Sequence, residues 1–265
     1  MRVARRRVMV ALVSAIALTA CGGTTGGGAT TWNATTVGVV DAGDGSLAFT
    51  NDLQASVVLT RAQLYVGAVY FNSAAPDEVD RESCISADDY VGQVMGGFNV
   101  DVLSAHAQPF PMQGEGIEDP AQSAAIWLTS GDVNAADDPA VIFDVAGAAT
   151  QSGVTYPFTG TVTIGENRVI PPEQGLPGAH PICLQRIVAP IAADFVLRNG
   201  GTLELQIDVR AIFADVDFSA LVPSADDPSQ YVIPDTNEGI GGDVFQGLHR
   251  DTGVYTFTYV DANGD

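Results

Sequence analysis

The chain of 265 residues contains no lysine, and its basic residues are eleven arginines and three histidines. Against them stand 32 aspartates and glutamates, so the formal net charge is −21 at pH 7. A surface this acidic repels the phosphates of nucleic acids and the headgroups of anionic lipids. The composition therefore excludes nucleic acid as a partner, and it leaves two interpretations of the acidity: solubility, or the attraction of cations.

Long apolar runs are lacking too, except for one close to the N-terminus. Four of the first seven residues are arginine, and the uncharged stretch VMVALVSAIALTA that follows is typical of a signal peptide and too short to span a bilayer. It ends in LTAC, residues 18–21, which resembles the lipobox of bacterial lipoproteins. The resemblance implies that residues 1–20 are a signal peptide that is removed, and that Cys21 is acylated and becomes the new N-terminus. The alternative is an ordinary secretory signal in which Cys21 plays no part.

The stretch after Cys21, GGTTGGGATT, has no apolar side chain that could pack. We therefore expect residues 21–36 to form a flexible linker between the lipid and the domain. Each buried CH₂ of the acyl chains contributes about 0.8 kcal/mol, and stable anchoring takes more than one chain. Residue 22 is glycine rather than aspartate, which by the sorting rule of enteric bacteria indicates the outer membrane. The prediction is an outer-membrane lipoprotein of the cell envelope, facing the periplasm or the cell surface and bound to the membrane through its N-terminal lipid.

Cysteine is scarce, and acylation of Cys21 leaves only Cys84 and Cys183. The compartment beyond the inner membrane is oxidising, and two cysteines allow one intramolecular pairing. We therefore predict a Cys84–Cys183 disulfide. It closes a loop of about a hundred residues, which in the chain-entropy model contributes roughly 4–5 kcal/mol. The alternative is a pair of free buried thiols or metal ligands.

Helix-forming patterns are few, whereas apolar and polar residues alternate along much of the chain. The clearest strand is TLELQIDV, residues 202–209, which the turn sequence NGG precedes. Upstream, IAADFVLR is the expected hairpin partner of this strand. Residues 55–71 exceed the length of one typical strand, and Gly67 marks a bulge or bend within them. The other expected strands are 98–103, 254–259 and the two segments that flank the turn ATQSG.

These strands predict an all-β fold, an antiparallel β-sandwich of the immunoglobulin-like or transthyretin-like kind. Residues 37–265 are expected to form a single domain, since no shift in composition divides them. One or two short helices are expected, the better one at SADDYVGQVMGG (86–97) and a single turn at DPAQSAA (119–125). Three connections are long: 72–85, 104–120 and 222–250.

Histidine is as scarce as cysteine, and no two of the three copies have a spacing typical of a local metal motif. His106, His180 and His249 all fall at expected strand ends or loops, where the fold could bring them together. His180 stands three residues before Cys183, an arrangement that could chelate a soft metal unless the cysteine is in a disulfide. These residues are the candidates for a copper site.

The sequence supports a calcium site better than it supports a copper site. The segment GDVNAADDP, residues 131–139, offers Asp132, Asn134, Asp137 and Asp138 within one expected turn. Carboxylate and amide oxygens with a glycine nearby suit a hard cation, although the spacing is not that of an EF-hand. A solvated polar turn is the alternative.

Motifs for catalysis are absent from the sequence. No G-x-S-x-G occurs, no glycine-rich phosphate loop joins a strand to a helix, and with 32 acidic residues carboxylate pairs arise by chance. We therefore do not expect an enzyme. The leading hypothesis is a non-enzymatic binding or structural module of the envelope.

Several stretches resemble uncharacterised lipoproteins of myxobacteria and related deltaproteobacteria. The likeness covers most of residues 45–260, and it is carried by VVLTRAQLYVGAVYFN, FNVDVL, IWLTSGDVNAADDPAVIFDVAGAA, YPFTGTVTIGENR, CLQRIVAPI and GLHRDTGVYTFTY. It implies no particular activity.

A second resemblance is to the MbnP-like family of periplasmic proteins, associated with copper and methanobactin handling. It is carried by the strand LYVGAVYF, by Trp127 on a central strand and by DVRAIFADVDF as a late strand. This resemblance implies periplasmic metal handling, with copper bound through His106, His180, His249 and an oxidised Trp127.

Overall fold

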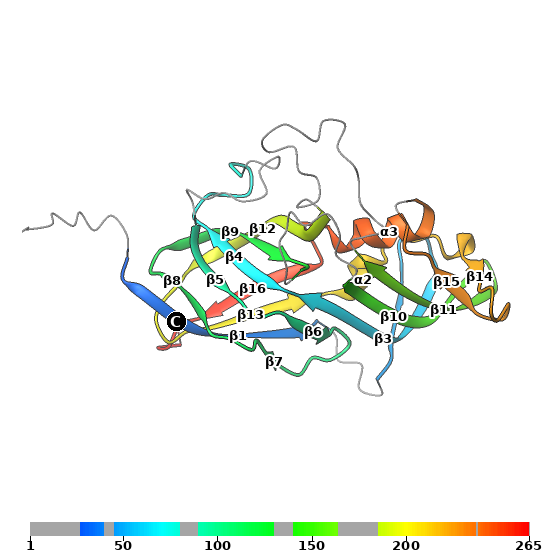
Figure 1. The fold of residues 1–265 in the computed structure, drawn as a ribbon, viewed down its shortest axis with the longest axis horizontal. Helices are drawn as coiled ribbons and strands as arrows, with labels where there is room; N and C mark the ends of the chain where they lie inside the picture. The colour runs from blue at the N-terminus through cyan, green and yellow to red at the C-terminus, as the bar shows by residue number, and fades with distance from the viewer. Residues whose placement is uncertain are drawn as a thin grey trace, which may run out of the picture.

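The structure is a computed structural model that describes residues 27–39, 45–79, 90–129, 140–163, 185–236 and 238–264. These residues form an all-β fold of two sheets that share one core, as predicted (Figure 1).

The first sheet has nine strands. They are β1 (Ala29–Gly38), β4 (Ala68–Asn72), β5 (Tyr90–Val94), β7 (Gln108–Pro109), β8 (Gly114–Ile117), β9 (Pro120–Trp127), β12 (Ile187–Val196), β13 (Thr202–Ile207) and β16 (Tyr255–Val260). Their order is β12-β9-β4-β5-β8-β1-β13-β16, with β7 also beside β1. The sheet curls until β12 and β16 meet: Phe195 stacks on Tyr259 with ring centroids 5.3 Å apart, and the Arg198 backbone N–H donates to the Tyr259 hydroxyl at 3.0 Å.

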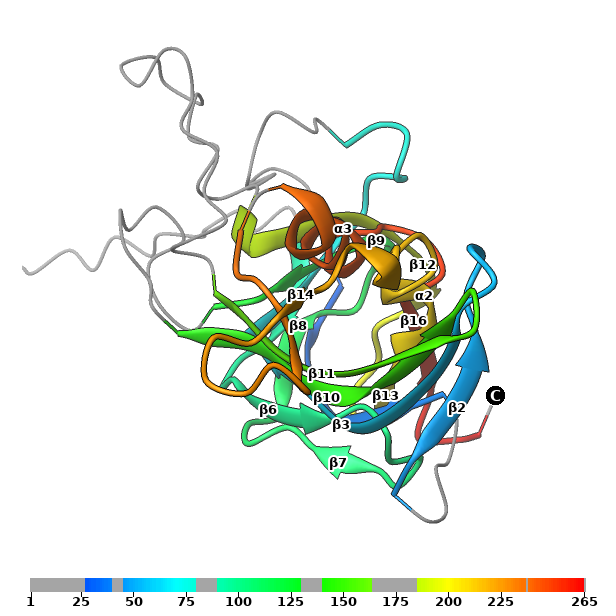
Figure 2. The ribbon, with the colours of Figure 1, turned by 90° about the vertical axis from the view of Figure 1, so that its right-hand side faces the viewer.

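The second sheet has seven strands. They are β2 (Leu47–Thr50), β3 (Ser56–Val66), β6 (Phe98–Asp101), β10 (Val141–Gln151), β11 (Val154–Thr163), β14 (Val222–Pro223) and β15 (Tyr231–Ile233). Their order is β14-β15-β11-β10-β3-β2, with β6 also beside β3. The helices α2 (Val209–Ile212) and α3 (Gly239–Leu248) and the 3-10 turn η1 (Phe218–Ala220) lie over its concave side (Figure 2).

Gly67 is the point at which the chain passes from one sheet to the other. β3 ends at Val66 in the second sheet, and β4 begins at Ala68 in the first. The Gly67 backbone N–H donates to the Trp127 carbonyl at 2.7 Å, which holds the junction against β9. The bend expected at this glycine is confirmed.

Different side chains cover the inner faces of the two sheets. Inside the curl of the first sheet, the Phe71 ring contacts Phe195 and Phe257 with centroids 5.5 and 5.4 Å away. Under the second sheet, the covering ring is Phe213, at the end of α2, whose centroid lies 6.1 Å from Phe143 and 6.4 Å from Phe158. Helical turns therefore bury the inner face of the second sheet, because the first sheet has curled onto itself.

The alternation predicted several strands correctly. β13, β6 and β16 overlap the expected segments, and Leu203, Leu205 and Ile207 are buried as the period of two requires. The strand expected at 202–209 is shorter, because α2 begins at Val209. β10 and β11 form the expected hairpin, with Ser152 and Gly153 at its turn at φ of 53° and 80°.

Two details of strand pairing differ from a purely antiparallel sandwich. β1 pairs with β13 in parallel, and so does β11 with β15. The expected hairpin between IAADFVLR and TLELQIDV is wrong: β12 pairs with β9, whereas β13 lies between β1 and β16. After β12, the NGG turn therefore carries the chain across β16, so that β13 pairs with β16 and not with β12.

Both expected helices are wrong where the structure describes them. Residues 90–94 form β5, in which Gly92 lies so close to Trp32 that an added Cβ would be 2.7 Å from the indole. Residues 120–125 belong to β9, whose small side chains pack in the core. Conversely, DVRAIFADVDF is not a strand, because Asp208 and Asp217 cap α2 and η1 by accepting hydrogen bonds from backbone N–H groups.

The structure also corrects the expected linker. β1 begins at Ala29, so residues 29–36 are part of the first sheet rather than of a flexible segment. The anchor of this strand is Trp32, 1% exposed and the largest fully buried side chain. Burial of so large an apolar surface outweighs the flexible character of the preceding glycines and threonines.

Candidate functional site

The predicted histidine ligands are not assembled where the structure describes them. His106 is exposed in the loop between β6 and β7, and its backbone N–H donates to Ser104 Oγ at 3.2 Å. His249 lies at the end of α3, on the far side of the molecule from β6 and β7 (Figures 1 and 2). His180 lies outside the described residues.

The two ring nitrogens of His249 are both engaged by backbone carbonyls. Nδ1 lies 2.9 Å from the Phe245 oxygen, and Nε2 lies 2.7 Å from the Gln185 oxygen. Burial lowers the pKa of His249, and the two carbonyls oppose this shift only in part. The ring therefore fastens α3 to the segment that leads into β12, and as placed it has no nitrogen left to bind a metal.

The remaining predicted ligands and cysteines lie outside the described residues: Asp132, Asn134, Asp137, Asp138, Cys21, Cys84 and Cys183. The calcium turn, the disulfide and the lipidation therefore stay predictions. Within the described ranges, no group of three or more histidine, cysteine or acidic side chains could hold a metal ion. No helix in these ranges is long and apolar enough to cross a membrane.

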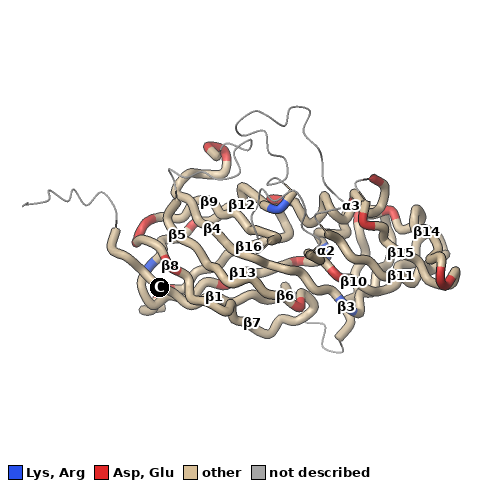
Figure 3. Tube along the Cα trace, in the orientation of Figure 1, with Lys and Arg blue, Asp and Glu red and all other residues tan. Residues whose placement is uncertain are grey.

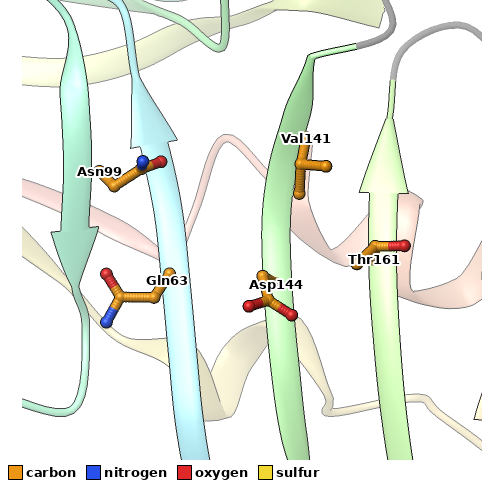
Figure 4. Close-up of a pocket in the computed structure, with 5 residues that line it drawn as sticks. All are labelled: Gln63, Asn99, Val141, Asp144 and Thr161. Atoms are coloured by element: carbon orange, nitrogen blue, oxygen red, sulfur yellow. The ribbon is translucent and has the colours of Figure 1, made fainter.

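An open depression of about 360 Å³ lies on the outer face of the second sheet (Figure 4). Its described lining comes from four strands and comprises Gln63, Asn99, Val141, Asp144 and Thr161. The carboxylate of Asp144 is held by Arg61, with Nε–Oδ2 and Nη2–Oδ1 distances of 2.9 and 3.0 Å. A paired carboxylate on a broad open surface, with no histidine or cysteine on this lining, is poorly suited to acid–base or nucleophilic chemistry.

The outer face of the first sheet carries a different group of side chains, which we call the aromatic face. It comprises Tyr70, Tyr90, Met95 and Trp127, from β4, β5, the residue after β5, and β9. The Tyr70 ring centroid lies 4.5 Å from that of Trp127 and 6.3 Å from that of Tyr90. The Tyr70 hydroxyl donates to Met95 Sδ at 3.3 Å, which completes a contiguous cluster.

The sheet register explains why these side chains meet. On β4, Phe71 points into the core, so Tyr70 points outward, where it lies between Ala125 of β9 and Gln93 of β5. Trp127 and Tyr70 pack over Ala125 and Ile187, which are buried beneath them. The cluster therefore stands on a rigid sheet, but Tyr90 and Met95 remain 40% and 36% exposed.

A polar edge completes the site. Gln93 pairs with Glu115 of the next strand, and its side-chain amide donates to Glu115 Oε1 at 2.8 Å. Burial raises the pKa of Tyr90, and the nearby Glu115 carboxylate and then Tyr70 raise it further. Burial also raises the pKa of Tyr70. Both shifts favour the neutral hydroxyl form of the two tyrosines.

Sequence reasoning singled out one member of this cluster, Trp127, through the MbnP-like resemblance. It missed Tyr70, Tyr90 and Met95, because two of these lie in the segment assigned to a helix. The signal available was the alternation in AVYFN, in which Tyr70 must face away from the buried Phe71.

Comparisons of the chain with protein-family models, with curated proteins and with solved structures each found no match.

Proposed function

We propose that this chain is a lipid-anchored, non-enzymatic binding protein of the cell envelope that presents its aromatic face to a ligand. The observation that carries the proposal is the contiguous cluster of Tyr70, Tyr90, Met95 and Trp127, partly exposed on the outside of a sheet. Tyrosine and tryptophan are enriched where proteins bind, because a rigid apolar ring and a polar tip serve one contact at small cost in side-chain entropy.

The N-terminal sequence supports the envelope location. Its arginine-rich start, apolar run and LTAC ending are those of a lipoprotein precursor. β1 begins at Ala29, so seven residues, 22–28, separate Cys21 from the first strand. Such a tether, at most about 3.5 Å per residue, holds the domain within a few nanometres of the lipid.

Replacement of the anchoring cysteine tests the location. In cells that express the full chain, Cys21→Ser is expected to move the protein from the membrane fraction to the soluble fraction. Mass spectrometry of the wild-type N-terminus should show an acylated Cys21 as the first residue. A wild-type protein that keeps residues 1–20, or that carries no lipid, contradicts this part of the proposal.

Hydroxyl-radical labelling tests the binding face. The ligand should shield Tyr90, Met95 and Trp127, so their labelling in intact cells should be lower than in the purified protein. Tyr156 and Tyr231, which form an edge-to-face pair on the second sheet with centroids 5.1 Å apart, are the matched controls and should be labelled equally in both samples. Equal labelling of the aromatic face in the two samples would refute its role in binding.

A further inference from the structure

We propose that the aromatic face binds a small soluble cation with an alkylated ammonium head, that is, a quaternary ammonium compound. The inference rests on the function proposed above, since it names the ligand class of the same face. Three observations carry it: the inclination of the rings, the carboxylate beside them and the distribution of the chain's positive charges.

The rings form an angled surface instead of a flat platform. Trp127 is inclined by 38° and Tyr90 by 57° to the ring of Tyr70 that lies between them. A cation is attracted to an aromatic face within about 6 Å of the ring centre. Tyr70 and Trp127 pack against each other with centroids 4.5 Å apart, so the ring most open to a cation is that of Tyr90, which is 40% exposed and lies 6.3 Å from Tyr70. A planar guanidinium stacks best on a single flat face, so inclined rings favour a rounded head.

The polar edge formed by Gln93 and Glu115 adds a negative charge beside the aromatic rings. Glu115 lies across the register from Gln93, which lies across from Tyr70, so its carboxylate borders the rings. After burial, the nearby Glu115 carboxylate is the next cause that raises the pKa of Tyr90, in keeping with this position. A ligand cation above the rings would be attracted both by the ring faces and by this carboxylate.

Of the five described arginines, Arg186 lies directly before β12 and is 0% exposed, so it presents no charge at the surface of this face. The exposed arginines are held in ion pairs elsewhere: Arg61 with Asp144, Arg198 with Asp261, Arg210 with Asp208 and Arg250 with Asp215. Figure 3 shows acidic positions scattered along the chain trace and few basic ones. Loss of residues 1–20 would leave seven arginines against 32 acidic residues. This charge attracts a free cation and repels a phosphate, which favours a soluble ammonium compound over a phosphocholine headgroup.

Choline and its neutral isostere, 3,3-dimethylbutan-1-ol, provide the decisive comparison, because the two have the same shape and differ in charge. The processed full chain in a maltoside detergent is titrated with each, and the tryptophan emission is followed. Trp127 reports on the face, whereas Trp32, the second of the two tryptophans, is 1% exposed and serves as an internal reference. Choline is expected to change the emission saturably and to bind at least about threefold more tightly than the alcohol. Phosphocholine is expected to bind more weakly than choline.

Variants assign the affinity to the rings and to the carboxylate. Tyr90→Leu, which removes a ring that is 40% exposed, is expected to weaken choline binding about three- to fivefold, whereas Tyr90→Phe retains it. Glu115→Gln is expected to weaken choline binding by about twofold without affecting the alcohol. Tyr156→Leu on the second sheet is the control and should bind as the wild type does. The thermal midpoint of each variant verifies folding.

Equal affinity for choline and the alcohol, or no saturable response to choline, overturns the inference. So does unchanged choline binding by Tyr90→Leu. These results are separable from a failure of the proposed function: shielding of the aromatic face in cells without choline binding would mean a ligand of another class, whereas unshielded rings in cells would reject the binding face itself.

Discussion

The outer faces of the two sheets differ in composition although both stand on closely packed cores. The first carries three aromatic rings and a thioether in one contiguous cluster, with the Glu115 carboxylate at its edge. The second carries polar side chains and scattered exposed valines such as Val141, and its charged pair, Arg61 and Asp144, is satisfied internally. A face whose charges are already paired has little left to offer a ligand. Exposed rings retain their attraction for a cation when they lie beside a carboxylate that forms no ion pair with a described residue.

The support beneath the two faces differs as well. The first sheet curls and buries its own inner side chains, among them Phe71 against Phe195 and Phe257. The second sheet relies on Phe213 and the helical segments for its cover. A change beneath the first sheet should therefore disturb the aromatic face and leave the second face intact.

The largest expected effect comes from Gly114→Ala in β8. An added Cβ would lie 2.1 Å from Trp32 Nε1, and the buried indole has no room to move aside. We expect the free energy of unfolding in urea to fall by about 1–3 kcal/mol, with a loss of choline affinity because Glu115 is the next residue. Gly28→Ala, whose Cβ would meet nothing within 4 Å, is the matched control. A Gly114→Ala protein as stable as wild type would show that Trp32 is loosely packed.

His249 joins the helices that cover the second sheet to the start of β12 in the first sheet. At this residue we expect a smaller, pH-dependent effect on the free energy of unfolding. Burial lowers the pKa of His249 in the folded state below the ordinary value of about 6.5. The unfolded chain therefore takes up a proton at a higher pH than the folded chain does. Stability from this group is complete above pH 6.5 and is lost as the pH falls from 6.5 toward the lowered folded-state pKa.

Urea unfolding of wild type and His249→Gln across pH 5–8 measures this contribution as the difference between the two pH profiles. The wild type should lose more stability than the variant as the pH falls below 6.5. The opposite slope would mean that the two carbonyls at 2.9 and 2.7 Å hold a charged imidazolium and outweigh the cost of burial.

The smallest effect is expected for Arg61→Ala on the second face. The side chains of Arg61 and Asp144 are 47% and 34% exposed, so solvent screens their attraction. The variant should lose no more than about 1 kcal/mol of stability, and the loss should shrink in high salt. Choline affinity should not change. A gain of choline binding on the second face, through the freed Asp144, would show that pairing is what keeps that face inactive.

The fold was largely predictable from alternation, since side chains of successive strand residues point to opposite faces wherever one face is buried. This pattern located β6, β10, β11, β13 and β16, and it indicated the bend at Gly67. It failed for α3, which contains four glycines. Two of them, Gly241 and Gly247, allow close approach to the backbone at Pro234 and Ile212, a benefit that exists only after folding.

The sequence by itself determined the acidity of the chain, the precursor-like N-terminus, the all-β class and the outward direction of Tyr70, because composition and periodicity are local properties. Only the tertiary structure decided which strands are neighbours. β4, β5 and β9 are separated along the chain, and their register alone brings Tyr70, Tyr90 and Trp127 into contact. Pairing between distant strands depends on the packing of the whole core, so the aromatic face arises from the fold and not from any single stretch of the sequence.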